Sequence, residues 1–89
     1  MKEKKLRREI LKYAYDKRTV NDQGTADLRE FSNIEGIDFG LKRSSIHFLQ
    51  NEGLIEKVDE GLNSIKITTN GIKTYEDNDL MNKVLPLDD

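Results

Sequence analysis

Hydrophobic positions recur at helical spacing near the start of the chain. Those that lie three and four residues apart, and therefore on one helix face, are Leu6, Ile10, Tyr13 and Ala14. Leu11 and Tyr15 form a second apolar pair on nearly the opposite side. A helix that is apolar on two sides usually contacts two partners. The pattern therefore predicts an amphipathic helix over Glu3 to Arg18, with its main stripe facing the core.

Two further helices are predicted before residue 53. Thr25 is a favourable N-cap for a short helix over about Ala26 to Asn33. A longer helix is predicted over Phe39 to Glu52, and Gly53 is expected to end it in a left-handed backbone conformation. The apolar arc of this longer helix is expected to contain Leu41, Ser45 and Leu49, with Ile46 and Phe48 at its margins.

A β-hairpin is predicted after the third helix. Short stretches rich in β-branched residues span 54–58 and 64–68, and residues 59–63 between them are typical of a turn. Either Thr68 or Thr69 is expected to cap a fourth helix.

The C-terminal part is predicted to be helical. Ile72 and Tyr75 belong to the fourth helix, and residues 77–79 either interrupt it or begin another short one. The apolar positions beyond are Leu80, Met81, Val84 and Leu85. Together with Leu11 and Tyr15, they form more apolar surface than a small monomer easily hides, which predicts a symmetric homodimer. The alternative is a monomer whose last helix folds back on its first helix.

The same patterns predict the core. Apolar positions at helical or strand spacing are expected to be largely buried when they face the centre of the domain. The predicted core residues are Leu6, Ile10, Leu28, Phe31, Leu41, Leu49, Leu54, Ile65, Ile67 and Ile72.

The composition limits the chain to one small domain and excludes several kinds of chemistry. The 89 residues are 35% apolar and 36% charged, with a mean hydropathy of -0.76, and they predict a single domain over residues 1–89. The chain has no Cys, which excludes disulfides and Cys-bearing zinc sites. With His47 as the sole histidine, we predict no enzyme, no metal site and no cofactor. No apolar run approaches the ~20 residues of a membrane span, and we expect a cytoplasmic protein without membrane contact.

The net charge of -2 conceals an asymmetry along the chain. Residues 1–20 hold eight Lys/Arg against three Asp/Glu, whereas residues 21–89 hold seven against fourteen. A uniformly basic nucleic-acid binder is therefore excluded, but a basic face on an acidic body is not. The candidates for phosphate contacts on the first helix are Arg7, Arg8, Lys12, Lys17 and Arg18.

Short motifs flank the predicted hairpin. The segment 48–55, FLQNEGLI, resembles the L-x-x-x-G-L-I junction between recognition helix and wing in MarR- and PadR-type regulators. The segment 67–71, ITTNG, resembles the I/L-T-x-x-G motif that ends the wing and opens the next helix. The segment 6–12, LRREILK, is more weakly similar to small YjcQ-type winged-helix proteins.

This resemblance implies a winged helix-turn-helix domain. Its fold class is mainly α with a small β-hairpin (α+β), with a three-helix core, a two-stranded wing and a C-terminal helix. The matching region covers about residues 6–76, which leaves 77–89 as the C-terminal helix and tail. The implied function is DNA binding in transcription regulation, although winged helices also serve as protein-interaction modules.

The predicted third helix has no acidic residue between Asp38 and Glu52 in an otherwise acid-rich chain. Its polar side offers a cation, amides and hydroxyls, the groups that contact base edges in the major groove. The candidate DNA-binding residues are Lys42, Arg43, Ser44, His47, Gln50 and Asn51. We expect Arg43 to contact guanine, and Lys42 to extend from the buried side to a phosphate. The predicted function is sequence-specific binding of double-stranded DNA by a small transcription regulator.

Acidic residues near the hairpin favour an alternative function, protein-protein interaction without DNA binding. Asp59 and Glu60 lie at the predicted wing tip, where carboxylates repel a phosphate backbone. Wing contacts to DNA would then come from Lys57, Asn63 or Lys66. An interaction module is expected to expose an apolar patch near Leu11, Tyr15, Leu80 and Met81.

Overall fold

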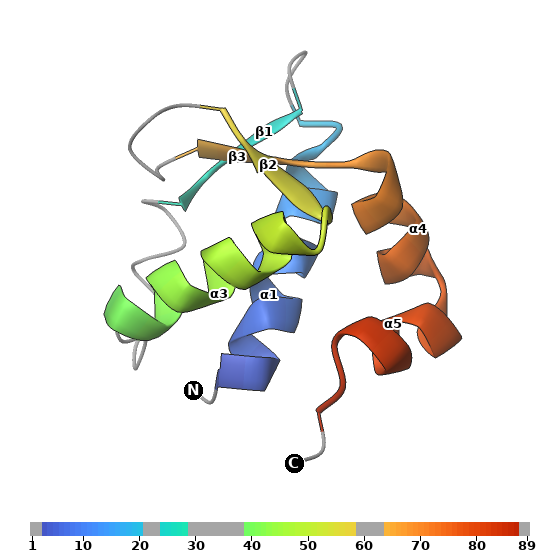
Figure 1. The fold of residues 1–89 in the computed structure, drawn as a ribbon. Coiled ribbons are helices and arrows are strands. Elements are labelled where there is room, and N and C mark those ends of the chain that lie inside the picture. The colour runs from blue at the N-terminus through green and yellow to red at the C-terminus, as the bar shows by residue number, and fades with distance from the viewer. Residues whose placement is uncertain (1–2, 21–23, 29–38, 59–63, 88–89) are drawn as a thin grey trace.

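Two long helices pack against each other at the centre of the molecule. The computed structural model describes residues 3–20, 24–28, 39–58 and 64–87. Helix α1 spans Glu3–Lys17 and helix α3 spans Phe39–Asn51. Both ends of each helix fall within one residue of the predicted bounds. Figure 1 shows α3 lying across α1, and the two helices make the most extensive helix-helix contact in the described part of the chain.

A three-stranded antiparallel sheet lies at one end of these helices (Figure 1). Its strands are β1 (Thr25–Asp27), β2 (Ile55–Lys57) and β3 (Ser64–Ile67), in the order β1-β3-β2. The β2-β3 pairing confirms the predicted hairpin, with its turn, residues 59–63, lying outside the described residues. Ile65 and Ile67 face the core, whereas Lys66 lies on the outer face, as the alternation predicts.

The prediction of a helix beginning at Ala26 is wrong, because this residue lies in β1. Ala26 pairs with Ile65 of β3, and both side chains are almost completely buried. The apolar contact and the backbone pairing with β3 outweigh the local preference of Thr25 for a helix cap. Leu28 has helical geometry, and the rest of the predicted helix, residues 29–33 with Phe31, lies outside the described residues.

Two short helices follow the sheet. Helix α4 spans Thr69–Glu76, and α5 spans Asn78–Val84. Thr68 caps α4 by accepting the amide of Gly71, which confirms Thr68 as the cap. The side chain of Asp77 accepts the amides at the start of α5, so a separate short helix begins there.

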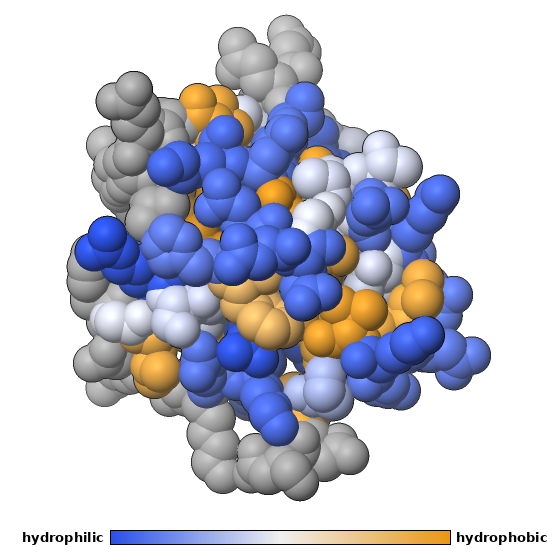
Figure 2. All heavy atoms as spheres, viewed as in Figure 1, coloured by the Kyte–Doolittle hydropathy of each residue, from blue (hydrophilic) through white to orange (hydrophobic). Residues whose placement is uncertain are grey.

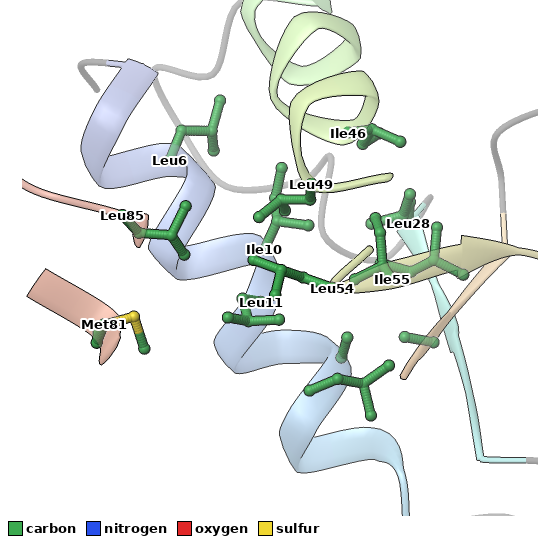
Figure 3. Close-up of a cluster of buried hydrophobic side chains, with 14 residues drawn as sticks. Leu6, Ile10, Leu11, Leu28, Ile46, Leu49, Leu54, Ile55, Met81 and Leu85 are labelled. Carbon is green, nitrogen blue, oxygen red and sulfur yellow. The ribbon is translucent and has the colours of Figure 1, made fainter. Parts of the chain in front are cut away.

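One hydrophobic cluster joins all these elements (Figure 3). Seven of the ten predicted core residues are buried: Leu6, Ile10, Leu28, Leu49, Leu54, Ile65 and Ile67. Leu41 and Ile72 are half-buried and pack against the cluster, and Phe31 lies outside the described residues. The cluster also contains Leu11, Ala14, Ala26, Ile46, Ile55, Met81 and Leu85.

Three of the six apolar residues that suggested a homodimer are buried within one chain. Leu11, Met81 and Leu85 have exposures of 0%, 8% and 1%, and Figure 3 shows the last two directed toward α1. Arg8 Nε donates to the Leu85 carbonyl at 2.6 Å, which fastens the end of α5 to α1. This arrangement corresponds to the alternative in which the last helix folds back on the first helix. Of the apolar residues on α5, Leu80 is the most exposed, at 37%.

The result is a small α+β domain with a radius of gyration of 12.0 Å. Its described residues form four helices, which gather on one side of the three-stranded sheet (Figure 1). None of these helices is long and apolar enough to cross a membrane.

Candidate nucleic-acid interface

The inner side of α3 fixes the orientation of the helix. Ser45, Ile46 and Leu49 are buried, with exposures of 2% or less. Leu49 is part of the cluster that also contains Leu6 and Ile10 of α1. The hydroxyl of Ser45 has no hydrogen-bond partner within the described part of the chain. Because this inner arc is packed, the outer arc of α3 is presented by a helix that has little freedom to rotate.

The C-terminal end of α3 is closed by backbone hydrogen bonds. Gly53 has a φ of 75°, in the left-handed region. The amide of Leu54 donates to the Leu49 carbonyl at 3.0 Å, and the amide of Gly53 donates to the Gln50 carbonyl at 3.0 Å. These two bonds form a Schellman motif. The motif turns the chain directly into β2, so the outer arc has a fixed position relative to the sheet.

Five of the six candidate DNA-binding residues are exposed on one side of α3. They are Arg43, Ser44, His47, Gln50 and Asn51. At 100° per residue they occupy an arc of about 120°. Helix α3 contains neither Asp nor Glu. Figure 2 shows hydrophilic side chains across the face of the molecule where α3 lies toward the viewer. This polar surface, defined by the five residues above, is called the α3 outer arc.

The sixth candidate, Lys42, does not extend to solvent, so that expectation is wrong. Its side chain is 9% exposed, and its Nζ donates to the Leu28 carbonyl at 3.3 Å. Burial lowers the pKa of Lys42, and the nearby Asp27 carboxylate partly opposes this shift. The ammonium group points inward because Leu28 offers an acceptor there, so Lys42 is not placed for a phosphate contact.

Most of the basic residues on and next to α1 contact neighbouring groups. Arg8 contacts the end of α5, and Lys12 pairs with Asp16 at 2.8 Å on the exposed side of α1. This ion pair raises the pKa of Lys12, through its hydrogen bond first and its charge second. The guanidinium of Arg18 lies 3.7 Å from the centre of the Tyr15 ring. Helix α1 therefore does not present its predicted basic residues as one uniform phosphate-binding stripe.

Arg7 differs from these cations because it lies beside the α3 outer arc. Its guanidinium stacks on the ring of Phe48 in α3, 3.7 Å from the ring centre. Its Nη2 atom is 3.4 Å from Glu3 Oε1, and the same oxygen accepts a 2.7 Å hydrogen bond from Ser44 Oγ. Glu3 thus places a carboxylate at the edge of the outer arc. This contact could not be predicted from the sequence, because an acidic residue in a first helical turn is common for helix stability alone.

The hairpin contributes two exposed cations, Lys57 and Lys66. Lys66 lies directly opposite Glu56 in the β2-β3 register, so a carboxylate accompanies it on the outer face of the sheet. The predicted wing-tip residues Asp59, Glu60 and Asn63 lie outside the described residues.

The described part of the chain contains no group of three or more acidic, His or Cys residues placed to hold a metal ion. Tyr15 donates a 2.6 Å hydrogen bond to Glu76, and this bond is the main cause of its raised pKa. The contact links α1 to α4, where the rings of Tyr15 and Tyr75 also pack with their centres 4.4 Å apart. This cluster connects two helices and lies on different elements from the α3 outer arc.

Comparisons of this chain with known proteins identify no related protein. No family model, no curated protein and no solved structure matches this chain. Any functional inference must therefore come from the residues and their arrangement.

Proposed function

We propose that this chain is a winged helix-turn-helix protein that binds double-stranded DNA through the α3 outer arc and acts as a transcription regulator. The order of α1, α3, the β2-β3 hairpin and α4 is compatible with this fold. In the proposal, α3 is the recognition helix and the hairpin is the wing. The motifs around residues 48–55 and 67–71 support the assignment, because both coincide with observed element boundaries.

The observation that carries the proposal is the chemistry of the α3 outer arc. Arg43 can donate two hydrogen bonds to guanine, and the Gln50 and Asn51 amides can each pair with adenine. His47 lies between them on the same exposed side. The absence of acidic residues from α3 removes charge repulsion along the length that would enter a groove. A rigid, acid-free helix face with these donors is suited to the major groove of DNA.

The alternative function is a protein-interaction module, which the acidic residues at the predicted wing tip favour. Such a module is expected to expose an apolar patch near Leu11, Tyr15, Leu80 and Met81. Leu11 and Met81 are buried, whereas Leu80 is 37% exposed, so only part of that patch is accessible in the described structure. The burial of Met81 and Leu85 beside α1 favours a monomer whose last helix folds back on its first helix. Sedimentation at micromolar concentration measures the oligomeric state, and a stable dimer would require a different interface.

A selection from random duplexes at about 50 and 200 mM salt tests the proposed function. We expect the parent to enrich one sequence class, and Arg43→Ala to bind it about 5- to 150-fold more weakly, corresponding to 1–3 kcal/mol at one base position. Lys73→Ala is the matched control, because it removes one exposed positive charge from α4 instead of α3. Equal effects of the two substitutions would contradict α3 as the sequence-reading element.

A further inference from the structure

One oxygen of Glu3 lies against two donors that belong to different helices. Ser44 Oγ of α3 donates to Glu3 Oε1 at 2.7 Å, and Arg7 Nη2 of α1 lies 3.4 Å from the same atom. An anionic oxygen at this position is therefore held by a hydroxyl and a guanidinium together. Both groups are common ligands of phosphate as well as of carboxylate.

Glu3 does not fully satisfy the charge of Arg7. Its 3.4 Å separation from Arg7 exceeds the roughly 2.7–2.9 Å of a strong charge-assisted hydrogen bond. The Nε atom of Arg7 has no hydrogen-bond partner within the described residues. The ring of Phe48 holds the guanidinium in place from the other side, so Arg7 stays beside Ser44 whether or not Glu3 is bound.

The Glu3 side chain is held only at the surface, where another anion can replace it. Its exposure is 34%, and its hydrogen bond with Ser44 is solvent-exposed. Exposed ion pairs of this kind contribute little to stability, typically about 0–1 kcal/mol. Displacement of the Glu3 carboxylate therefore costs the fold little.

We propose that Ser44 Oγ and the Arg7 guanidinium form a subsite for one phosphate group of the DNA backbone, which Glu3 occupies in the free protein. This inference rests on the proposed function. Ser44 is adjacent to Arg43, so a phosphate in the subsite would fix the helix position beside the residue expected to contact a base. Glu3 acts as an internal competitor that lowers the affinity for every sequence alike.

The substitution Glu3→Gln tests this competition, with Glu9→Gln as its matched control. Both remove one negative charge from α1, but Glu9 lies six residues further on, about 120° around the helix from Glu3. We expect Glu3→Gln to raise duplex affinity roughly 3- to 10-fold more than Glu9→Gln does. The salt dependence should also steepen by about one charge relative to this control. Adding Ser44→Ala to Glu3→Gln should remove most of the gain.

Inorganic phosphate provides a second probe that does not depend on DNA binding. Nuclear magnetic resonance spectra of Glu3→Gln report the Ser44 amide and the Arg7 guanidinium. Added phosphate should shift both resonances in a saturable way, and the same resonances of the parent should shift less. Saturable shifts without duplex binding would support the anion subsite but contradict the proposed function. A different outcome would overturn the subsite but not the proposed function. In that outcome, duplex binding depends on Arg43, phosphate causes no shifts, and Glu3→Gln and Glu9→Gln bind the duplex equally well.

Thermal unfolding of each variant separates binding from folding. If Glu3→Gln were poorly folded, Ser44→Ala in the parent background would decide the question, because it removes an exposed hydroxyl of α3 and leaves the sequence of α1 unchanged. The subsite predicts weaker duplex binding by Ser44→Ala at every sequence. Unchanged binding would overturn it.

Discussion

Substitution of Gly71 by Ala tests the packing that joins α4 to the hairpin. A Cβ atom at this position would overlap the carbonyl oxygen of Leu54 and come within 2.6 Å of Ile67 Cγ1. Neither neighbour can move easily. The Leu54 carbonyl accepts the amide of Thr68 at 3.0 Å, and Thr68 Oγ1 both accepts the Gly71 amide and donates to the Gly53 carbonyl.

The expected loss combines three effects. Overpacking of a tight site costs about 1–3 kcal/mol. If α4 moves away to relieve this overpacking, the Thr68 cap weakens. A helix cap of this kind contributes about 0.5–2 kcal/mol to stability. The higher helix propensity of Ala returns up to about 1 kcal/mol. We therefore expect Gly71→Ala to lower the free energy of unfolding by about 0.5–5 kcal/mol, against the roughly 5–15 kcal/mol typical of a domain.

Gly53→Ala is the matched control, because it changes another glycine at the same junction without a clash. A Cβ atom there meets nothing within 4 Å, and the φ of 75° alone makes Ala unfavourable, by about 1–2 kcal/mol. Urea unfolding monitored by circular dichroism measures both losses. If Gly71→Ala were as stable as the parent, the close approach of α4 to Leu54 would be refuted.

Three further substitutions test how α3 is packed, with Leu80→Ala on α5 as a control. Leu49→Ala should lower the free energy of unfolding by about 2–5 kcal/mol in urea titrations, whereas Leu80→Ala should lower it by less than about 1 kcal/mol. Similar losses for the two variants would mean that the buried face of α3 is wrongly assigned. Ser45→Ala should leave stability unchanged or raise it by up to about 1 kcal/mol, because the lost hydroxyl is buried without a partner in the described residues; a clear loss in the same titration would reveal a hydrogen bond. For Lys42 the folded pKa lies below its ordinary value of 10.5, so the unfolded chain binds this proton more tightly. The free energy of unfolding of the parent should therefore rise relative to that of Lys42→Met between neutral pH and about pH 10. If urea titrations show that this difference falls over the range, the burial of the Lys42 ammonium would be contradicted.

The parts of the fold that depend on local patterns could be predicted from the sequence. The periodicity of Leu6 and Ile10 places α1, and Gly53 marks the end of α3 within two residues. The hairpin follows from alternation in β3, and Thr68 caps α4 as expected. Each of these features needs only residues within a few positions of one another.

The features that the sequence did not predict depend on contacts between distant residues. Three residues are too few for β1 to show alternation, and this strand exists because Ala26 pairs with Ile65. The apolar pattern of α5 shows that it needs a partner, but nothing in it distinguishes α1 from a second chain. The inward direction of Lys42 depends on the Leu28 carbonyl, and the position of Glu3 depends on Ser44, 41 residues away.

The most direct test of DNA binding through α3 is a titration of the isotope-labelled protein with its selected duplex. The titration is monitored through the amide resonances of the protein. DNA binding through α3 predicts the largest changes along the α3 outer arc, at Arg43, Ser44, His47 and Gln50. The amides of Tyr75 and Leu80, on α4 and α5, should change little. No change with any duplex at about 50 mM salt, or changes confined to α4 and α5, would contradict the proposal.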